Sequence, residues 1–172
     1  MLFLLRSGLY ISLGTVIHGA TVFFKKCIKA FSGKNVSVIM SVGKTFNIKR
    51  LREIPDNFIV VNAAPQIRVL KQANVFITHG RMNSVSEAMT FGVPMIVIPF
   101  SADQPTNAEQ IEKLGIGVRL DYSDLTIQSL TDTVFFVLND EQIKQNITFM
   151  REKIECSLGN NGAVRIIEKY YR

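Results

Sequence analysis

The chain contains short, continuously apolar runs, separated by segments in which apolar residues follow a different spacing. The apolar runs are bounded by turn residues and lie at 9–13, 36–42, 58–61, 75–78, 95–98 and 117–120. Apolar runs of this length without alternation are typical of strands that are buried on both faces. The pattern therefore predicts six parallel strands in the interior of the protein.

Between these runs, apolar residues recur at helical spacing. In 20–31 they fall on one helix face and the lysines fall on the other, and similar spacing recurs in 108–114, 127–138 and 143–154. Strands that alternate with helices predict an α/β fold with a Rossmann-like, doubly wound parallel sheet. After Leu120 the strand pattern stops, and we expect three helices with breaks at 139–140 and 159–162.

Length and composition indicate how many domains the chain forms, and its charge indicates which ligands it attracts. The chain has 172 residues, of which 47% are hydrophobic, and this is enough for one well-buried domain over 1–172. The net charge of +6 comes largely from basic residues in 25–29 and 44–52. Dispersed basic loops are typical of a solvated face, or of attraction to an anionic ligand or an acidic partner. Because no recognition helix or aromatic platform accompanies them, we do not expect nucleic-acid binding.

The cysteines and the first residues of the chain indicate the cellular compartment of the protein. Cys27 and Cys156 lie in helical patterns without the spacing of metal ligands, so we expect buried free thiols, a reducing compartment and no metal site. The apolar start at 1–5 ends at Arg6, has neither a basic leader nor a cleavage site, and is too short to span a bilayer. We therefore expect a cytoplasmic protein that meets a membrane only through a partner.

The most informative segment is 76–87, where a strand-like run enters a Gly turn and then a helix that begins with polar residues. A helix N-terminus offers unpaired backbone N–H groups and the positive end of the helix dipole, so this arrangement predicts a phosphate site. His79, at the end of the run, can add a further donor. The run at 95–98 leads to Asp103 and Gln104, which we expect at the same carboxyl edge of the sheet, where ligands of open α/β sheets bind.

Each of these features also has a purely structural interpretation. Ser84 and Glu87 have the S-x-x-E spacing of a capping box, which would stabilise the helix without a ligand. Asp103 is a good helix N-cap. Gly14 and Thr15 form an ordinary turn after the first strand, although a small turn also lets the backbone approach a ligand closely. The two interpretations are compatible, because a capped helix mouth can still contact phosphate.

The joint order of five short motifs resembles that of a known family. The motifs are Ala64-Pro65-Gln66, His79-Gly80, Asn83-Ser84 with Glu87, Gly92-Val93-Pro94, and Asp103-Gln104. Together they resemble the donor-binding signature of family 1 glycosyltransferases of the GT-B fold, and they are most similar to the bacterial macrolide glycosyltransferases. The resemblance runs from about Tyr10 to the C-terminus. Because those enzymes have two domains and more than twice this length, it implies the C-terminal, nucleotide-sugar-binding domain without its N-terminal acceptor domain.

The resemblance also implies a function. It implies a UDP-sugar as donor, UDP-glucose in the first place, and metal-independent transfer of the hexosyl group to an acceptor hydroxyl, with no cofactor beyond the donor substrate. The residues that it implies for donor binding are Gly14 and Thr15 in a loop facing the diphosphate, Ala64 and Gln66 around the uracil, His79, Gly80, Asn83 and Ser84 at the diphosphate, Glu87 at the ribose, and Asp103 and Gln104 at the sugar. In the resembled enzymes the catalytic base is a His of the N-terminal domain. No catalytic residue is therefore expected here, and the chain alone is expected to bind donor without turnover.

Two positions depart from the family pattern. Ala63 stands where an aromatic residue often stacks on the base, and because such a contact is worth roughly 1–3 kcal/mol in other nucleotide sites, we expect weaker or less selective nucleotide binding. Arg81 replaces a Gly that lets the backbone pass close to the diphosphate or adopt positive φ. The Arg either obstructs the site, in a strained backbone conformation, or supplies a bidentate phosphate contact.

Three other interpretations stay open at this stage. In the first, the chain is the donor-binding subunit of a split glycosyltransferase with a membrane-anchored acceptor subunit. In the second, which Ala63 and Arg81 suggest, it is a non-catalytic remnant. In the third, it is a generic Rossmann-like cofactor binder. The last is disfavoured, because no G-x-G-x-x-G follows the first strand.

Overall fold

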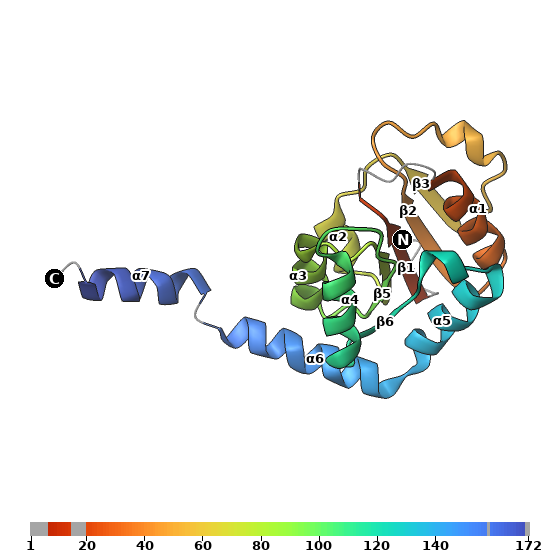
Figure 1. The fold of residues 1–172 in the computed structure, drawn as a ribbon. Helices are drawn as coiled ribbons and strands as arrows, with labels where there is room; N and C mark the ends of the chain where they lie inside the picture. Colours follow the sequence, from red (N-terminus) through yellow and green to blue (C-terminus); the bar gives the residue numbers. More distant parts are fainter. Residues whose placement is uncertain (1–6, 15–19, 158, 171–172) are drawn as a thin grey trace.

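The computed structural model describes residues 7–14, 20–157 and 159–170, and its centre is a parallel sheet. The strands are β1 (Ser7–Ser12), β2 (Val36–Ser41), β3 (Phe58–Val61), β4 (Val75–Thr78), β5 (Met95–Val97) and β6 (Gly117–Arg119). Their order across the sheet is β3-β2-β1-β4-β5-β6, and every neighbouring pair is parallel (Figure 1). The six predicted strands are thus confirmed, although β1 begins at Ser7, before its apolar run.

Helices cover both faces of the sheet. The helices of the described chain are α1 (Ala20–Phe31), α2 (Gln66–Leu70), α3 (Met82–Phe91), α4 (Gln104–Lys113), α5 (Ile127–Asn139), α6 (Glu141–Cys156) and α7 (Gly159–Tyr170), with short 3-10 helices η2 (Ile48–Leu51) and η3 (Tyr122–Asp124); all but α7 lie beside the sheet. One buried cluster lies between the sheet and α1 and α5, and a second lies between the sheet and α2, α3, α4 and α6. This arrangement confirms the predicted Rossmann-like, doubly wound α/β fold. No helix in the described part of the chain is long and apolar enough to cross a membrane.

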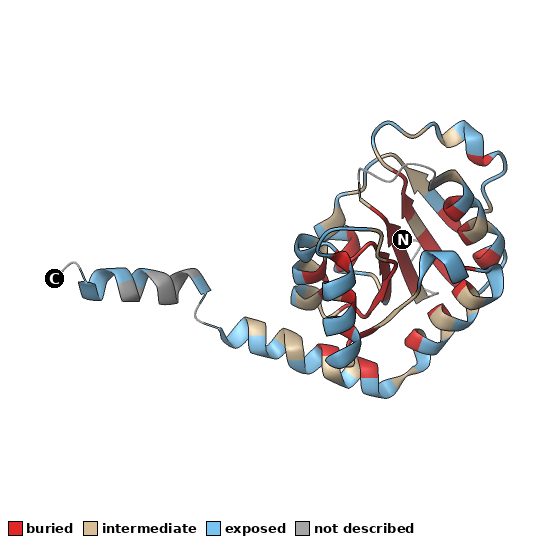
Figure 2. Ribbon diagram, viewed as in Figure 1, coloured by how far each residue is buried: buried red, intermediate tan, exposed pale blue. Residues whose placement is uncertain are grey.

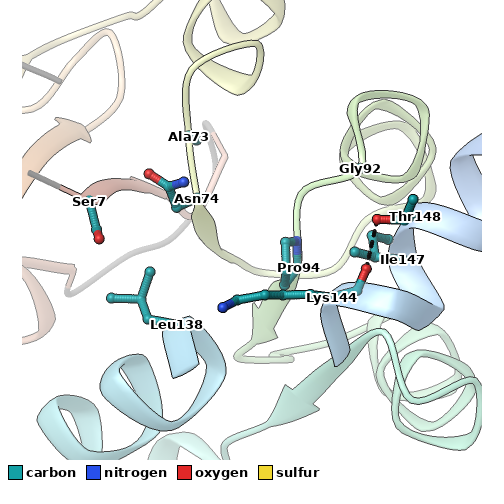
Figure 3. Close-up of a pocket in the computed structure, with 9 residues that line it drawn as sticks. All are labelled: Ser7, Ala73, Asn74, Gly92, Pro94, Leu138, Lys144, Ile147 and Thr148. Atoms are coloured by element: carbon teal, nitrogen blue, oxygen red, sulfur yellow. Dashed lines mark hydrogen bonds between the residues drawn. The ribbon is translucent and has the colours of Figure 1, made fainter. Parts of the chain in front are cut away.

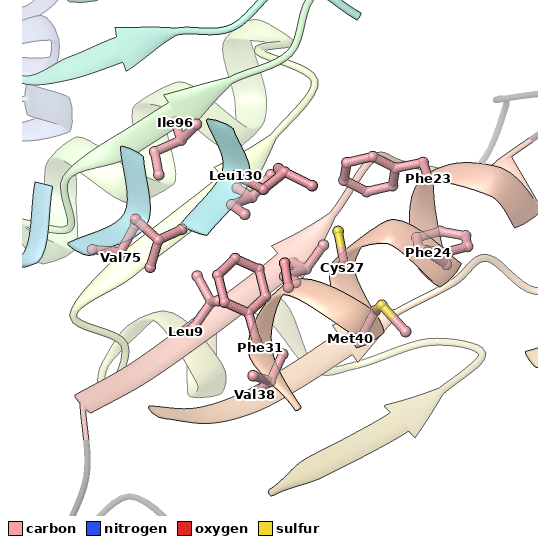
Figure 4. Packing of buried hydrophobic residues seen from close by; sticks show 14 of the residues in the cluster. Leu9, Phe23, Phe24, Cys27, Phe31, Val38, Met40, Val75, Ile96 and Leu130 are labelled. Carbon is pink, nitrogen blue, oxygen red and sulfur yellow. The ribbon is translucent and has the colours of Figure 1, made fainter. Parts of the chain in front are cut away.

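Side chains of each strand alternate between the two clusters. On β1, Leu9 and Ile11 belong to the cluster under α1 and α5, and Figure 4 shows Leu9 on the same side as Phe31 of α1. Tyr10 points to the other face and stacks on Phe76 of β4, with the ring centroids 4.8 Å apart. Figure 2 shows the buried residues concentrated in the strands and on the inner sides of the helices. Because both faces are covered, the strands read as continuous apolar runs.

The C-terminal helices differ from the expectation at one point. Asp140 separates α5 from α6 as predicted, and its side chain caps α6 by accepting a hydrogen bond from the Ile143 N–H. The predicted break at 159–162 is wrong. The chain leaves the helix at Ser157, whose backbone is extended (φ −67°, ψ 141°), and 159–162 are already part of α7. In Figure 1, α7 projects away from the sheet.

The two cysteines are both free but differ in environment. Cys27 is fully buried in α1, as expected, and burial raises the pKa of its thiol. Cys156 is exposed, so the expectation of a buried thiol is wrong there. The reason is its place in the last turn of α6, where the neighbouring residues are also exposed.

Candidate functional site

The predicted donor-binding residues lie in loops that follow the carboxyl ends of the strands. Gly14 follows β1, Gln66 opens the helix after β3, His79 follows β4, and Asp103 lies in the loop after β5. Because all strands are parallel, these loops emerge at the same edge of the sheet, which is the edge where open α/β sheets bind ligands. Thr15 lies outside the described residues.

His79 packs against the turn after β1. Gly14 has a φ of +75°, and a Cβ at this position would stand 2.9 Å from Nε2 of His79, so the glycine makes room for the imidazole. Burial, together with the Arg81 charge, lowers the pKa of His79 to about 4, while Asp103 acts in the opposite direction. At neutral pH His79 is therefore a neutral imidazole with one N–H to donate.

Helix α3 begins at Met82, directly after the His79-Gly80 turn. The side chain of its N-cap residue, Arg81, forms no capping hydrogen bond. The expected capping box of Ser84 and Glu87 is wrong, because the helix starts before Ser84 and places that residue within its first turn. The N-terminal end of α3, called its mouth below, therefore presents backbone N–H groups and the positive end of the helix dipole at the carboxyl edge of the sheet.

Arg81 has an ordinary backbone conformation. The positive φ of the turn, +85°, belongs to Gly80, whereas Arg81 is extended at φ −66° and ψ 143°. The expectation of backbone strain at Arg81 is therefore wrong. Its side chain is exposed, and its charge acts on both His79 and Asp103 to lower their pKa values. The guanidinium thus contributes positive potential to the phosphate end of the candidate site.

Asp103 connects α4 to the mouth of α3. It stands at the N-cap position of α4 but makes no side-chain cap there, contrary to expectation. Its Oδ2 instead accepts hydrogen bonds from the Met82 N–H (3.4 Å) and from Asn107 Nδ2 (2.9 Å), and Asn107 also donates to the Gly80 carbonyl oxygen (2.8 Å). Desolvation acts to raise the pKa of Asp103, but these hydrogen bonds, one from its own backbone and the Arg81 charge together lower it. Asp103 is an acceptor at neutral pH.

Gln104 is buried beside Asp103 and holds the loop after β5. Its Oε1 accepts hydrogen bonds from the backbone N–H groups of Phe100 (2.8 Å) and Ser101 (3.2 Å). Since these contacts occupy the carbonyl end of the amide, the NH₂ end is the part left to face a ligand.

Gln66 links three elements of the candidate site. Its Nε2 donates to Ser84 Oγ (3.2 Å) and Glu87 Oε2 (2.7 Å), and its Oε1 accepts from the Tyr10 hydroxyl (3.2 Å). The structure therefore brings together the predicted base-binding and ribose-binding residues, and it shows that their side chains contact one another.

Sequence reasoning missed Tyr10, Ser41 and Asn107. Ser41 ends β2, and its Oγ accepts a hydrogen bond from the Ala64 N–H (3.3 Å), which fixes the start of the segment before α2. A polar group at the end of an otherwise apolar strand was a signal for Ser41, and a hydroxyl within an apolar strand was a weaker one for Tyr10. Asn107 lies inside a helix, and no local pattern distinguishes it.

A cavity of about 400 Å³ lies away from these loops. It is lined by Ser7 at the start of β1, by Asn74 and Pro94, which precede β4 and β5, and by residues of α6, and Figure 3 shows the Lys144 side chain reaching into it. This is the amino edge of the sheet, so the cavity is separate from the candidate site. The described residues contain no group of His, Cys, Asp or Glu side chains that could hold a metal ion.

Comparisons with known proteins agree with this geometry. A sequence model of the family described as UDP-glucoronosyl and UDP-glucosyl transferase matches residues 7–153. NDP-glycosyltransferase YjiC of Bacillus subtilis (strain 168) is 39% identical over 167 residues, which are 97% of this chain and 43% of that protein. Oleandomycin glycosyltransferase of Streptomyces antibioticus is 26% identical over 159 residues, which are 92% of this chain and 37% of that protein. Among solved structures, the glycotransferase of kitacinnamycin aligns with a TM-score of 0.90 and 32% identity over 95% of this chain and 43% of that chain.

These matches show both the family of the chain and the part of its relatives to which the chain corresponds. The range matched by the family model contains every predicted donor-binding residue, from Gly14 to Gln104. The solved relatives are GT-B glycosyltransferases, and the aligned part is their C-terminal half. The chain spans about two fifths of the length of the curated relatives described above. The resemblance inferred from the motifs is therefore confirmed: the chain belongs to the UDP-glucoronosyl and UDP-glucosyl transferase family.

Proposed function

We propose that the chain is the donor-binding domain of a glycosyltransferase and binds a UDP-sugar, UDP-glucose in the first place, for transfer of the hexosyl group to an acceptor hydroxyl. The observation that carries the proposal is the mouth of α3, which follows His79 and opens at the carboxyl edge of the sheet without a side-chain cap from its N-cap residue. Membership of a family described by UDP-glucosyl transfer supports it.

The proposed diphosphate position lies between His79, the mouth of α3 and Arg81. When the bond between the sugar and the diphosphate breaks, negative charge increases on the diphosphate leaving group. Hydrogen-bond donors that are already in place stabilise this charge without reorganisation. The neutral His79 N–H and the amides that follow Met82 in the first turn of α3 are such donors, since the Met82 N–H itself bonds to Asp103, and the helix dipole has the favourable sign.

The nucleoside and the sugar fit on either side of this position. The segment from Ala64 to Gln66 would line the uracil, and the Glu87 carboxylate would accept hydrogen bonds from the ribose hydroxyls. On the sugar side, Asp103 supplies an acceptor, and Gln104 supplies its amide NH₂, because its carbonyl oxygen is bound to the loop. The proposed site thus contacts the donor at its nucleoside end and at its sugar end.

We further propose that turnover requires an acceptor-binding half, in the same polypeptide or in a separate subunit, that provides the base for the acceptor hydroxyl. Support comes from α7, which projects from the domain and exposes Val164, Ile167 and Tyr170. A second protein surface would cover these side chains. We place the reaction in the cytoplasm, a proposal supported by the free thiols of Cys27 and Cys156.

Calorimetric titration of the 172-residue chain tests the proposed function. UDP is expected to bind, weakly, because Ala63 cannot stack on the base, and uridine is expected to bind more weakly still. ADP is the matched control, since it carries the same diphosphate on another base. Binding of ADP but not UDP, or of neither, would reject the assignment.

The variant His79→Ala sharpens this test. Loss of one hydrogen bond to a charged group costs roughly 1.5–3 kcal/mol, so UDP affinity should fall by about ten- to a hundredfold while uridine affinity stays unchanged. An equal loss for both ligands would mean that His79 only supports the fold. Thermal unfolding of the variant, measured in parallel, identifies that case.

Arg81→Gly is expected to lower UDP affinity and to flatten its dependence on salt, because the exposed guanidinium adds positive potential beside His79 and Asp103. The backbone gives no reason for a compensating gain, since Arg81 is unstrained. Titrations at low and high ionic strength measure both effects. Arg68→Gly, on the short helix α2, is a control for the general loss of one exposed positive charge. Tighter UDP binding by Arg81→Gly would instead show that the side chain obstructs the site.

A further inference from the structure

The Tyr10 hydroxyl is a buried polar group without a role in the function proposed above. Tyr10 lies in the middle of β1, is 1% exposed, and stacks on Phe76 with ring planes only 12° apart. The stacked ring fixes the direction of the phenol. Its hydroxyl donates to Gln66 Oε1 at 3.2 Å.

Tyr10 and Glu87 together determine which way the Gln66 amide is turned. An amide has an acceptor end and a donor end, and the two are nearly identical in shape. The Tyr10 hydroxyl holds the acceptor end, so the donor end faces Ser84 and Glu87. The reverse orientation would place the amide oxygen against the Glu87 carboxylate, two acceptors with no proton between them.

The amide in turn orients the Glu87 carboxylate. Gln66 Nε2 lies 2.7 Å from Oε2 of Glu87, which is the short distance of a hydrogen bond to a charged acceptor. This contact uses one carboxylate oxygen and fixes the plane of the group. The second oxygen, Oε1, has no hydrogen-bond partner among the described residues, and Glu87 is only half-buried, so Oε1 is the oxygen that a ligand can reach.

We infer that Tyr10 is a positioning residue for the ribose end of the nucleotide site, acting through Gln66 on the Glu87 carboxylate. Burial of the phenol raises its pKa, so Tyr10 remains a neutral donor at neutral pH. The inference rests on the proposed function, because it assigns the ribose hydroxyls to Glu87. It also assigns the Gln66 side chain a role other than contact with the base, namely to orient the Glu87 carboxylate.

The test compares UDP with dideoxyuridine diphosphate, which lacks both ribose hydroxyls, by calorimetry on the wild-type chain and on Tyr10→Phe. The variant keeps the stacked ring and removes only the hydroxyl. UDP affinity is expected to fall by roughly three- to tenfold, the range that one neutral hydrogen bond supports, while affinity for the dideoxy compound stays the same. Tyr170→Phe, at the exposed end of α7, is the matched control and should change neither affinity.

A second pair of variants tests the route through Gln66. Gln66→Ala is expected to reduce affinity for UDP more than affinity for the dideoxy compound, and Tyr10→Phe should then have no further effect in the Gln66→Ala background. If Tyr10→Phe proves unfolded, Gln66→Ala alone carries the test. Equal losses for both nucleotides, an unchanged UDP affinity, or additive effects of the two substitutions would overturn the inference. If the wild-type chain binds both nucleotides equally well, Glu87 does not bind ribose and this inference fails while the proposed function stands; if it binds neither, the proposed function itself fails.

Discussion

Acidification is expected to destabilise the folded domain by up to roughly 3 kcal/mol through His79 alone. The pKa of His79 is lowered from 6.5 to about 4, chiefly by burial, so the unfolded chain binds the proton more readily than the folded chain does. Stability therefore falls as the pH drops below about 6.5, and this contribution is complete below about 4. The difference between the two pKa values, converted at about 1.4 kcal/mol per unit, gives the magnitude.

Urea unfolding at several pH values measures this effect. Carboxylates also titrate in the same range, so the decisive quantity is the difference between the wild-type chain and His79→Asn, which cannot be protonated. His79→Asn should lose less stability than the wild type between pH 7 and pH 4. His18→Asn is the matched control, because His18 and His79 are the two histidines of the chain. An identical pH dependence in wild type and His79→Asn would show that His79 is not held neutral by the fold.

Gly80→Ala is expected to reduce the free energy of unfolding by roughly 2–4 kcal/mol. Gly80 has a φ of +85°, a backbone conformation that costs an L side chain about 1–2 kcal/mol, and a Cβ at this position would overlap Val97 Cγ1 in the core. The reduced freedom of the unfolded chain returns only about 0.4–1 kcal/mol. Chemical denaturation at neutral pH gives the number.

Two comparisons separate the backbone penalty of Gly80→Ala from the penalty of the overlap with Val97. Gly33 has a similar φ of +67° but no atom within 4 Å of the corresponding Cβ, so Gly33→Ala should show the backbone penalty alone, about 1 kcal/mol. Val97→Ala removes the overlapping methyl group, so the double variant with Gly80→Ala should lose less stability than the sum of the single variants. Equal losses in Gly33→Ala and Gly80→Ala, with additive behaviour toward Val97→Ala, would show that the packing of Gly80 against β5 is unimportant.

The sequence determined the α/β fold and the edge at which the predicted residues gather. Strands that are buried on both faces read as apolar runs, and helices that cover them show one apolar face, so both periods are visible along the chain. The turn from β4 into α3 was also visible, since a Gly after a buried run and before polar residues has few other interpretations. Even the family could be named from the spacing of short motifs.

Tertiary structure decided which side chains contact one another at that edge. The capping box predicted for Ser84 and Glu87 is absent because α3 starts at Met82, before Ser84, and both side chains instead bind Gln66 of α2. The Asp103 carboxylate does not cap α4; it accepts hydrogen bonds from the Met82 N–H of α3 and from the Asn107 side chain. The low pKa of His79 likewise comes chiefly from burial, with a contribution from the Arg81 charge that Asp103 opposes. Periodicity is a local property of the chain, whereas hydrogen-bond partners and desolvation depend on which loops the strand order β3-β2-β1-β4-β5-β6 brings together.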